Sequence, residues 1–246
     1  MNRLRFILLL CLSLSTLVGA RELPPAYYLI GNSLTWDTVP ARIDGDVQWH
    51  VDCGKPIAYI HAHPEKPCVK TSTLWPKALK TKQYTFLSVQ PHYDASVASA
   101  AEAIGHWIRL QPNAIVVIHT GWAHHENRAE EYAANTATGK LVHSEAHYAA
   151  LMAQLKKEFP KRIFRSTHAM RLLHQIATDI EAGKAPLKDV AELHRDAIHV
   201  THTGGRYLMH NCMRHALNQP RSSKGFEKID PKLKAYLDGV LDTLKP

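Results

Sequence analysis

The segment Tyr27-Tyr28-Leu29-Ile30-Gly31-Asn32-Ser33-Leu34-Thr35 decides the fold prediction for this 246-residue chain. Its first four residues are apolar or aromatic, as in a buried strand, and Gly31 permits a tight turn directly after them. Residues 32–34 can then begin a helix, which exposes Ser33 near free backbone N–H groups. We therefore expect a first strand that ends in a turn presenting a serine.

Four more apolar runs follow, with helical patterns between the later ones. The runs are Val47–Val51, Tyr84–Val89, Ala114–Ile118 and a weaker one at Arg162–Arg165. Helices are predicted over residues 95–110, 144–159 (with Ser144 as the cap) and 170–182. This alternation predicts a three-layer α/β/α, flavodoxin-like fold with a five-stranded parallel sheet of order 2-1-3-4-5. Such sheets bind ligands at the carboxyl ends of their strands, where Ser33 is expected.

The first twenty residues have the pattern of a signal peptide. Arg3 and Arg5 precede an apolar stretch, Phe6–Val18, and Val18-Gly19-Ala20 resembles a cleavage site. We expect a secreted or periplasmic protein, with an uncleaved N-terminal anchor as the alternative. The prediction divides the chain into a signal peptide (1–20), one domain (21–220), and a C-terminal loop and helix packed on it (221–246). No stable membrane insertion is expected after cleavage.

Charge and cysteines narrow the class of protein. Removing Arg3 and Arg5 from the 30 basic residues leaves 28, against 22 acidic ones. The basic residues are scattered and form no nucleic-acid-binding motif, so nucleic-acid recognition is not indicated. Outside the cytoplasm, Cys53 and Cys68 could form a disulfide, whereas Cys212 lies in an apolar helical pattern that predicts a buried thiol.

A second segment, Arg195-Asp196-Ala197-Ile198-His199, places a carboxylate and an imidazole three residues apart. In a turn, Asp196 can hold one ring nitrogen of His199 while the other nitrogen faces a nucleophile. Alone, Ser33 could be a helix cap, and the Asp-x-x-His pair could be a turn with a loop histidine. Together they are the three side chain types that activate a hydroxyl, which predicts a hydrolase.

The Gly-Asn-Ser-Leu block at 31–34 and Asp196-x-x-His199, in this order and context, resemble the SGNH (GDSL-type) hydrolase superfamily over residues 27–217. The resemblance implies a serine esterase that acts on carboxylic esters through an acyl-enzyme and without a cofactor. It implies that Ser33 is the nucleophile, His199 the general base and acid, and Asp196 the group that orients the histidine.

The resemblance also implies an oxyanion hole. Its donors would be the backbone N–H groups of Ser33 and of Gly54, which follows the second strand, and a side chain after the third strand. The family's Gly-x-Asn-Asp is absent there, and Gln90 stands in the place of the asparagine. A competing match, Gly121-Trp122-Ala123-His124, follows the fourth strand.

A substrate cleft is expected around the same sheet edge. Trp36 and Trp122 could stack on sugar rings, and His92 and His124 could line the cleft. The expected substrate is an O-acyl ester of a small molecule or a carbohydrate.

Two alternatives stay open. One is a metal-dependent hydrolase that uses a cluster of His124, His125, His143 and His147, of which the last two are four residues apart. The other is a non-catalytic protein of the same fold that binds a glycan or a partner protein, because the Gly-x-Asn-Asp block is missing.

Overall fold

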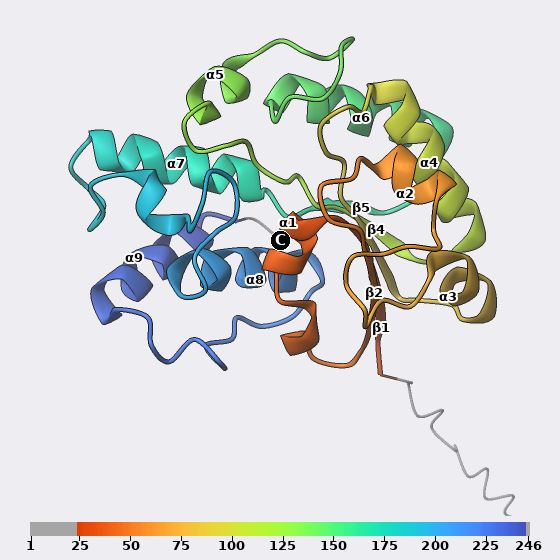
Figure 1. The fold of residues 1–246 in the computed structure, drawn as a ribbon, viewed down its shortest axis with the longest axis horizontal. Coiled ribbons are helices and arrows are strands. Elements are labelled where there is room, and N and C mark those ends of the chain that lie inside the picture. Colours follow the sequence, from red (N-terminus) through yellow and green to blue (C-terminus); the bar gives the residue numbers. More distant parts are fainter. Residues whose placement is uncertain (1–23, 245–246) are drawn as a thin grey trace, which may run out of the picture.

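The computed structural model describes residues 24–244, and a parallel sheet runs through its centre (Figure 1). Its five strands lie in the order β2-β1-β3-β4-β5, and every neighbouring pair is parallel, which confirms the predicted fold. The strands are β1 (Ala26–Gly31), β2 (Asp46–Val51), β3 (Phe86–Val89), β4 (Ile115–Ile118) and β5 (Phe164–Ser166).

Helices connect the strands and extend the chain beyond β5. The α-helices are α1 (Ser33–Asp37), α2 (Ile57–Ala62), α3 (Trp75–Thr81), α4 (Val97–Leu110), α5 (Arg128–Ala133), α6 (Glu145–Glu158), α7 (Ala169–Glu181), α8 (Gly204–Ala216) and α9 (Pro231–Leu241), with 3-10 turns η1 (Pro40–Arg42) and η2 (Val190–Leu193). Ser144 caps α6 as predicted, because its side chain accepts the His147 N–H.

Side chains of β1 alternate between two cores on opposite faces of the sheet. On one face, Tyr28 and Ile30 belong to a cluster with residues of α2, α3, α4 and α6. On the other face, Tyr27 and Leu29 pack with residues of α8, and α8 packs with α7 and α9 in a further cluster. Helices therefore cover both faces, which gives the three layers seen in Figure 1.

Short elements and strand limits depart from the sequence prediction. β5 begins at Phe164, two residues later than expected. Arg162 belongs to the preceding turn instead, where its guanidinium donates to the carbonyls of Ile108 and Gln111, both at 3.2 Å. The helices α2, α3 and α5 were not predicted. They have six or seven residues each, too few to give a clear helical period.

The carboxyl ends of β1, β2 and β3 lie side by side. Gly31 at the end of β1 is in register with Val51 at the end of β2. Gln90, directly after β3, donates its backbone N–H to β1 at 3.0 Å. Ser33, Gly54 and Gln90 therefore follow strands whose ends meet at one edge of the sheet.

The predicted signal peptide lies outside the described residues. Within residues 24–244, no helix has the length and apolar character needed to cross a bilayer. The structure contains the predicted disulfide between Cys53 and Cys68, and Cys212 is a buried free cysteine on α8.

Candidate active site

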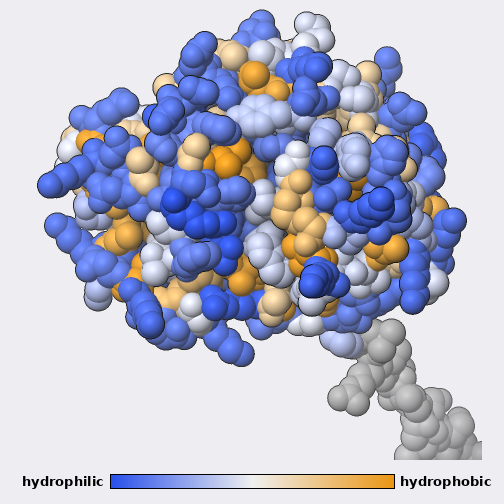
Figure 2. Space-filling view, viewed as in Figure 1, coloured by the Kyte–Doolittle hydropathy of each residue, from blue (hydrophilic) through white to orange (hydrophobic). Residues whose placement is uncertain are grey.

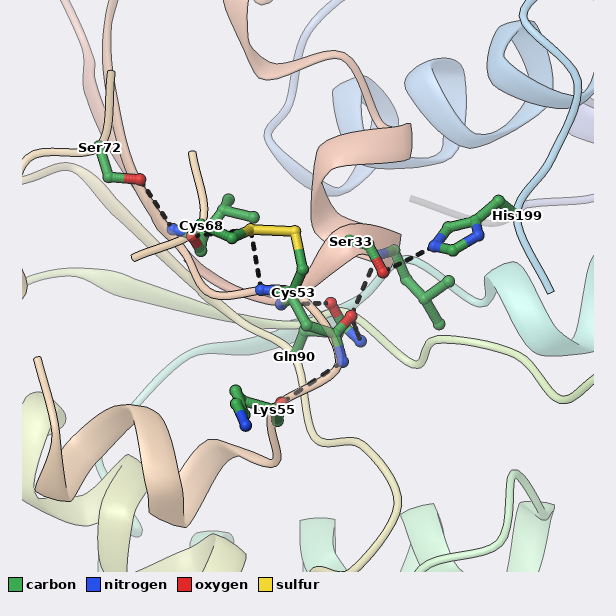
Figure 3. Close-up of a disulfide and its surroundings, with 10 residues drawn as sticks. Ser33, Cys53, Lys55, Cys68, Ser72, Gln90 and His199 are labelled. Carbon is green, nitrogen blue, oxygen red and sulfur yellow. Dashed lines mark hydrogen bonds between the residues drawn. A yellow bond between two sulfur atoms is a disulfide. The ribbon is translucent and has the colours of Figure 1, made fainter. Parts of the chain in front are cut away.

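Ser33 and His199 are 166 residues apart in the sequence and meet at the carboxyl edge of the sheet (Figure 3). The His199 Nε2 atom lies 2.9 Å from Ser33 Oγ. On the other side of the ring, Nδ1 lies 2.9 Å from Asp196 Oδ2. With the ring proton on Nδ1, facing the carboxylate, Nε2 can accept a hydrogen bond from the serine hydroxyl. The structure thus brings together the three residues singled out in the sequence.

The Asp196 carboxylate is fixed by the turn that it begins. Its Oδ1 accepts the backbone N–H groups of Ile198 at 3.0 Å and His199 at 2.7 Å. Partial burial acts to raise the pKa of Asp196, but hydrogen bonds from these N–H groups and from the His199 ring outweigh it and lower the pKa to about 2. The carboxylate is therefore ionised near neutral pH and holds the proton on His199 Nδ1.

The turn that presents Ser33 contains a close contact that requires glycine. A Cβ atom added to Gly31 would lie 2.1 Å from Thr35 Oγ1 and 2.7 Å from both Cβ and Oε1 of Gln90. Asn32 then caps α1, because its Oδ1 accepts a backbone N–H two residues later at 3.0 Å. These contacts make Ser33 the first residue of the helix.

Gln90 lies beneath this turn and is 1% exposed. Its Oε1 accepts the backbone N–H groups of Asn32 at 3.1 Å and Thr35 at 2.9 Å, and the Thr35 hydroxyl at 2.7 Å. Its Nε2 donates to Asn32 Oδ1 at 2.9 Å. Gln90 is therefore a positioning residue for the turn. The second Nε2 N–H has no acceptor within residues 24–244, and its assignment as an oxyanion donor stays a prediction.

Gly54 lies in the loop that follows β2, beside the turn after β1. The two segments touch where the Lys55 carbonyl accepts Asn32 Nδ2 at 3.4 Å. Gly54 is exposed and has a φ of +68°, a left-handed conformation that favours glycine. In the described part of the chain, the backbone N–H groups of Gly54 and Ser33 have no hydrogen-bond acceptor. Both donors are therefore free to bind a ligand.

A buried ionic cluster joins the two segments that carry the site. Asp37 ends α1, and its side chain is 0% exposed. Its carboxylate accepts hydrogen bonds from Arg195 Nη1 at 3.0 Å, Arg206 Nε at 2.9 Å and the Val200 N–H at 3.1 Å. Asp37 thus connects the helix that begins with the serine to the segment that carries the histidine.

The loop after β4 holds that segment from the other side. Trp122 Nε1 donates to the Ile198 carbonyl at 2.6 Å, and the His125 N–H donates to the Ala197 carbonyl at 2.9 Å. The prediction that Trp122 stacks on a sugar ring is wrong, because its side chain is 1% exposed and lies in the core. Its indole N–H instead positions the residue before the histidine.

The other predicted cleft residues differ in exposure. Trp36 and His124 are half-buried, whereas His92 is 8% exposed. Trp36 meets Trp49 edge-on with 5.9 Å between ring centroids, and the His124 ring lies 6.2 Å from that of Tyr93. Contact of Trp36, His92 and His124 with a substrate stays a prediction.

The alternative metal centre is not assembled. It required His124, His125, His143 and His147 to gather around one ion. Among the described residues, no group of three or more His, Cys, Asp or Glu side chains is arranged to hold a metal ion. The His143 ring instead contacts Glu131, with 3.3 Å between Nδ1 and Oε2.

A cavity of about 630 Å³ lies elsewhere, beside β5 and the end of α8. None of the predicted site residues lines it; its lining is Met152, Phe164, Arg165, Ser166, His168, His215, Ala216, Asn218, Gln219 and Pro220. We place the candidate site at Ser33 because the reactive side chain types converge there, at the edge where parallel sheets bind ligands.

Sequence reasoning missed the residues that fasten the site. Asp37 follows the serine by four positions, and Arg195 directly precedes Asp196. An acidic residue beside one motif and a basic residue beside the other are a signal that the two could form an ion pair. Many other charged residues in the chain could form such a pair equally well. The contact of Trp122 with the histidine segment has no signal of its own in the sequence.

Comparison with solved structures finds the same fold elsewhere. A DUF4886 family protein from Bacteroides uniformis aligns with 88% of this chain and 93% of its own, with a TM-score of 0.57 and 18% identity. A protein from Parabacteroides merdae described as a GDSL-like lipase aligns with 80% of this chain and 97% of its own, with a TM-score of 0.48 and 12% identity. The first likeness shows a shared fold. No protein-family model matches the chain, and no curated protein matches it in sequence.

Proposed function

We propose that the protein is a serine esterase of the SGNH type that hydrolyses carboxylic esters through a covalent acyl-enzyme. The observation that carries the proposal is the 2.9 Å contact between Ser33 Oγ and His199 Nε2, with Asp196 on the other ring nitrogen. The block after β1 and the position of the serine at the carboxyl edge of the sheet support it.

In the proposed reaction, Ser33 Oγ attacks the ester carbonyl carbon while His199 Nε2 takes the hydroxyl proton. The ionised Asp196 stabilises the imidazolium that forms. The tetrahedral intermediate collapses when His199 gives its proton to the leaving alcohol. A water molecule, deprotonated by His199, then attacks the acyl carbon. His199 returns this proton to Ser33 Oγ as the bond to the acyl carbon breaks, which releases the acid and restores the serine hydroxyl.

Negative charge develops on the carbonyl oxygen during both attacks. We assign the backbone N–H groups of Ser33 and Gly54 as its donors, with Gln90 Nε2 as a third. The first two are supported by their lack of other acceptors within residues 24–244. Loss of one such donor typically lowers the rate by about 100- to 1,000-fold.

We propose an O-acyl ester of a small molecule or a carbohydrate as the substrate. Figure 2 supports this choice, because the face over α1 is largely hydrophilic and its apolar residues form small, separate groups. A long acyl chain would favour a continuous apolar surface. Trp36 and His124, both half-buried, are the side chains that we expect beside the alcohol part of the ester.

A secreted or periplasmic location is part of the proposal. The disulfide between Cys53 and Cys68 supports it, because exposed disulfides persist in oxidising compartments. We propose residues 21–220 as the catalytic domain, with residues 221–246 as an addition to it. Cell fractionation and N-terminal sequencing test the location, and a mature chain that starts near Arg21 is the expected result.

The direct test of the function is labelling and turnover. We expect the purified protein to hydrolyse 4-nitrophenyl acetate and a fluorophosphonate to label Ser33. Ser33→Ala should lower turnover by at least about 1,000-fold, whereas Ser223→Ala, at an exposed loop serine, should leave it unchanged. Absence of both hydrolysis and labelling would favour a non-catalytic glycan- or partner-binding protein. Loss of activity to a chelator would favour a metal-dependent hydrolase.

A further inference from the structure

The loop that carries Gly54 is fastened on both sides. A disulfide joins Cys53 to Cys68, and the Lys55 carbonyl accepts the side chain amide of Asn32 at 3.4 Å. Figure 3 shows the disulfide and Lys55 near the turn that presents Ser33. The N–H group assigned above as an oxyanion donor belongs to the peptide bond between Cys53 and Gly54. The disulfide therefore holds the residue whose peptide bond carries this donor.

The other half of the disulfide is anchored to the sheet. Cys68 begins a segment that runs beside β2. Val69 donates its N–H to the Val51 carbonyl at 3.3 Å, and Thr73 donates its N–H to the Trp49 carbonyl at 2.8 Å. Because Val51 ends β2 in register with β1, the position of Cys68 is fixed relative to the edge that carries the candidate site.

The peptide between Cys53 and Gly54 lies in the middle of a turn. The Lys55 N–H donates to the Asp52 carbonyl at 3.3 Å, and the Asp52 N–H donates to the Gly31 carbonyl at 3.0 Å. In the described part of the chain, the C=O and N–H of the Cys53–Gly54 peptide itself have no hydrogen-bond partner. Both residues are exposed, and a Cβ atom added to Gly54 would meet nothing within 4 Å. The Cys53 N–H donates to Cys68 Sγ at 2.9 Å, a contact that itself depends on the disulfide. Without the covalent link, the turn keeps its bonds at Asp52 and Lys55, but none of these bonds involves the Cys53–Gly54 peptide group itself.

We propose that the Cys53–Cys68 disulfide is a positioning element for catalysis, which holds the Gly54 N–H toward the developing oxyanion. This inference rests on the proposed function. Opening the disulfide allows the peptide to rotate, so that the donor is misplaced in part of the molecules. The contact between Ser33 and His199 is unaffected, because neither residue is bonded to this loop. The loss falls on the transition state and not on substrate binding.

The test uses the double variant Cys53→Ser/Cys68→Ser, assayed with 4-nitrophenyl acetate well below its melting temperature. We expect kcat to fall by about 10- to 100-fold, which is less than the loss caused by removing an oxyanion donor completely. KM should change by less than about twofold. A trifluoromethyl ketone forms a hemiketal with the serine and places its oxyanion in the same hole. Its inhibition constant should rise by a factor similar to the fall in kcat.

Reduction gives an independent route to the same state. Dithiothreitol converts the disulfide into two thiols and is itself oxidised to a cyclic disulfide. It should lower the kcat of the wild type to that of the double variant and leave the double variant unchanged.

Leu237→Ala is the control for lost stability, since it removes a buried side chain of α9. If the double variant keeps kcat and inhibitor affinity, or loses activity only with its unfolded fraction as Leu237→Ala does, the disulfide has no positioning role. That result, with wild-type turnover still dependent on Ser33, overturns this inference alone. A wild type without esterase activity and without serine labelling overturns the proposed function and this inference with it.

Discussion

The carboxylate of Asp37 and the guanidinium of Arg195 lie 3.0 Å apart, and this contact joins the two halves of the candidate site. Asp37 ends the helix that Ser33 begins, whereas Arg195 opens the turn that leads to His199. Arg206 places a second guanidinium 2.9 Å from the same carboxylate. The approach of serine to histidine therefore depends on a buried ionic cluster as well as on their own hydrogen bond.

Asp37→Asn should weaken both the fold and the reaction. The change leaves two arginines without their carboxylate, which costs about 3 kcal/mol for a buried pair. A displacement of the histidine segment by about 1 Å would lower kcat by roughly 100-fold. Urea denaturation and esterase kinetics measure the two effects. The control is Asp46→Asn. The ion pair between Asp46 and Lys82 is partly exposed, so its loss should lower the free energy of unfolding by less than about 1 kcal/mol and leave turnover unchanged. Wild-type kcat in Asp37→Asn would show that the cluster does not position the site.

Gln90→Leu should reduce activity in the folded protein. It leaves the buried N–H groups of Asn32 and Thr35 without an acceptor, at a cost of about 1–3 kcal/mol each. Because the turn that presents Ser33 loses its support, kcat should fall by roughly 100-fold. Gln111→Leu is the matched control, since Gln111 is also fully buried and accepts a backbone N–H at 2.8 Å. Equal losses of kcat in both variants, measured in the folded state, would contradict the prediction.

Trp122→Phe should affect turnover through one hydrogen bond. The donor to the Ile198 carbonyl is lost, at a cost of about 1 kcal/mol. The smaller phenyl ring also leaves a cavity, which destabilises the fold. A loss of that size in the transition state lowers kcat by up to about tenfold. Trp107→Phe provides the comparison, because the buried Trp107 N–H has no partner in the described part of the chain. The prediction fails if the two variants have the same kcat.

Folding stability should fall as the pH is lowered from about 6.5 to 4.5. Burial lowers the pKa of His50, His119 and His210 to about 4, whereas an unfolded histidine titrates near 6.5. Between these values the unfolded chain binds more protons than the folded protein, so acid favours unfolding. Asp196, with its pKa lowered to about 2, stabilises the folded protein fully above the ordinary aspartate pKa, and this contribution is lost as the pH falls from about 4 to 2. Urea midpoints at several pH values measure the slope. A constant midpoint from pH 7 to 4.5 would refute the prediction.

The strands and motifs that could be predicted from the sequence are those whose pattern lies within a few consecutive residues. The apolar run before Gly31 marks β1, and three positions separate Asp196 from His199, so each motif is visible alone. The strand order follows from the alternation of strands and helices, because crossover connections have one handedness. The pairing of Ser33 with His199 could be expected once both motifs were assigned to one edge of the sheet.

The part of the site that could not be predicted from the sequence consists of side chain contacts between distant segments. Gln90 lies 58 positions from Asn32, and Arg195 lies 158 positions from Asp37. Such side chain contacts produce no periodicity, and several other polar residues could serve equally well in a sequence pattern. Whether Trp122 packs in the core or lines the cleft could not be decided for a similar reason, since an aromatic residue after a strand fits both positions.

The space beside Gly31 has a consequence for how this sequence can change. Thr35 Oγ1 and the Gln90 side chain already occupy the place of a Cβ atom at position 31. A larger residue there becomes possible only if position 35 loses its hydroxyl and position 90 loses even its Cβ atom or moves away, which removes the support of the turn. These three positions, spread over β1, α1 and the end of β3, are therefore expected to vary together. In a search for relatives, they form one discontinuous pattern that is more specific than the Gly-Asn-Ser tripeptide.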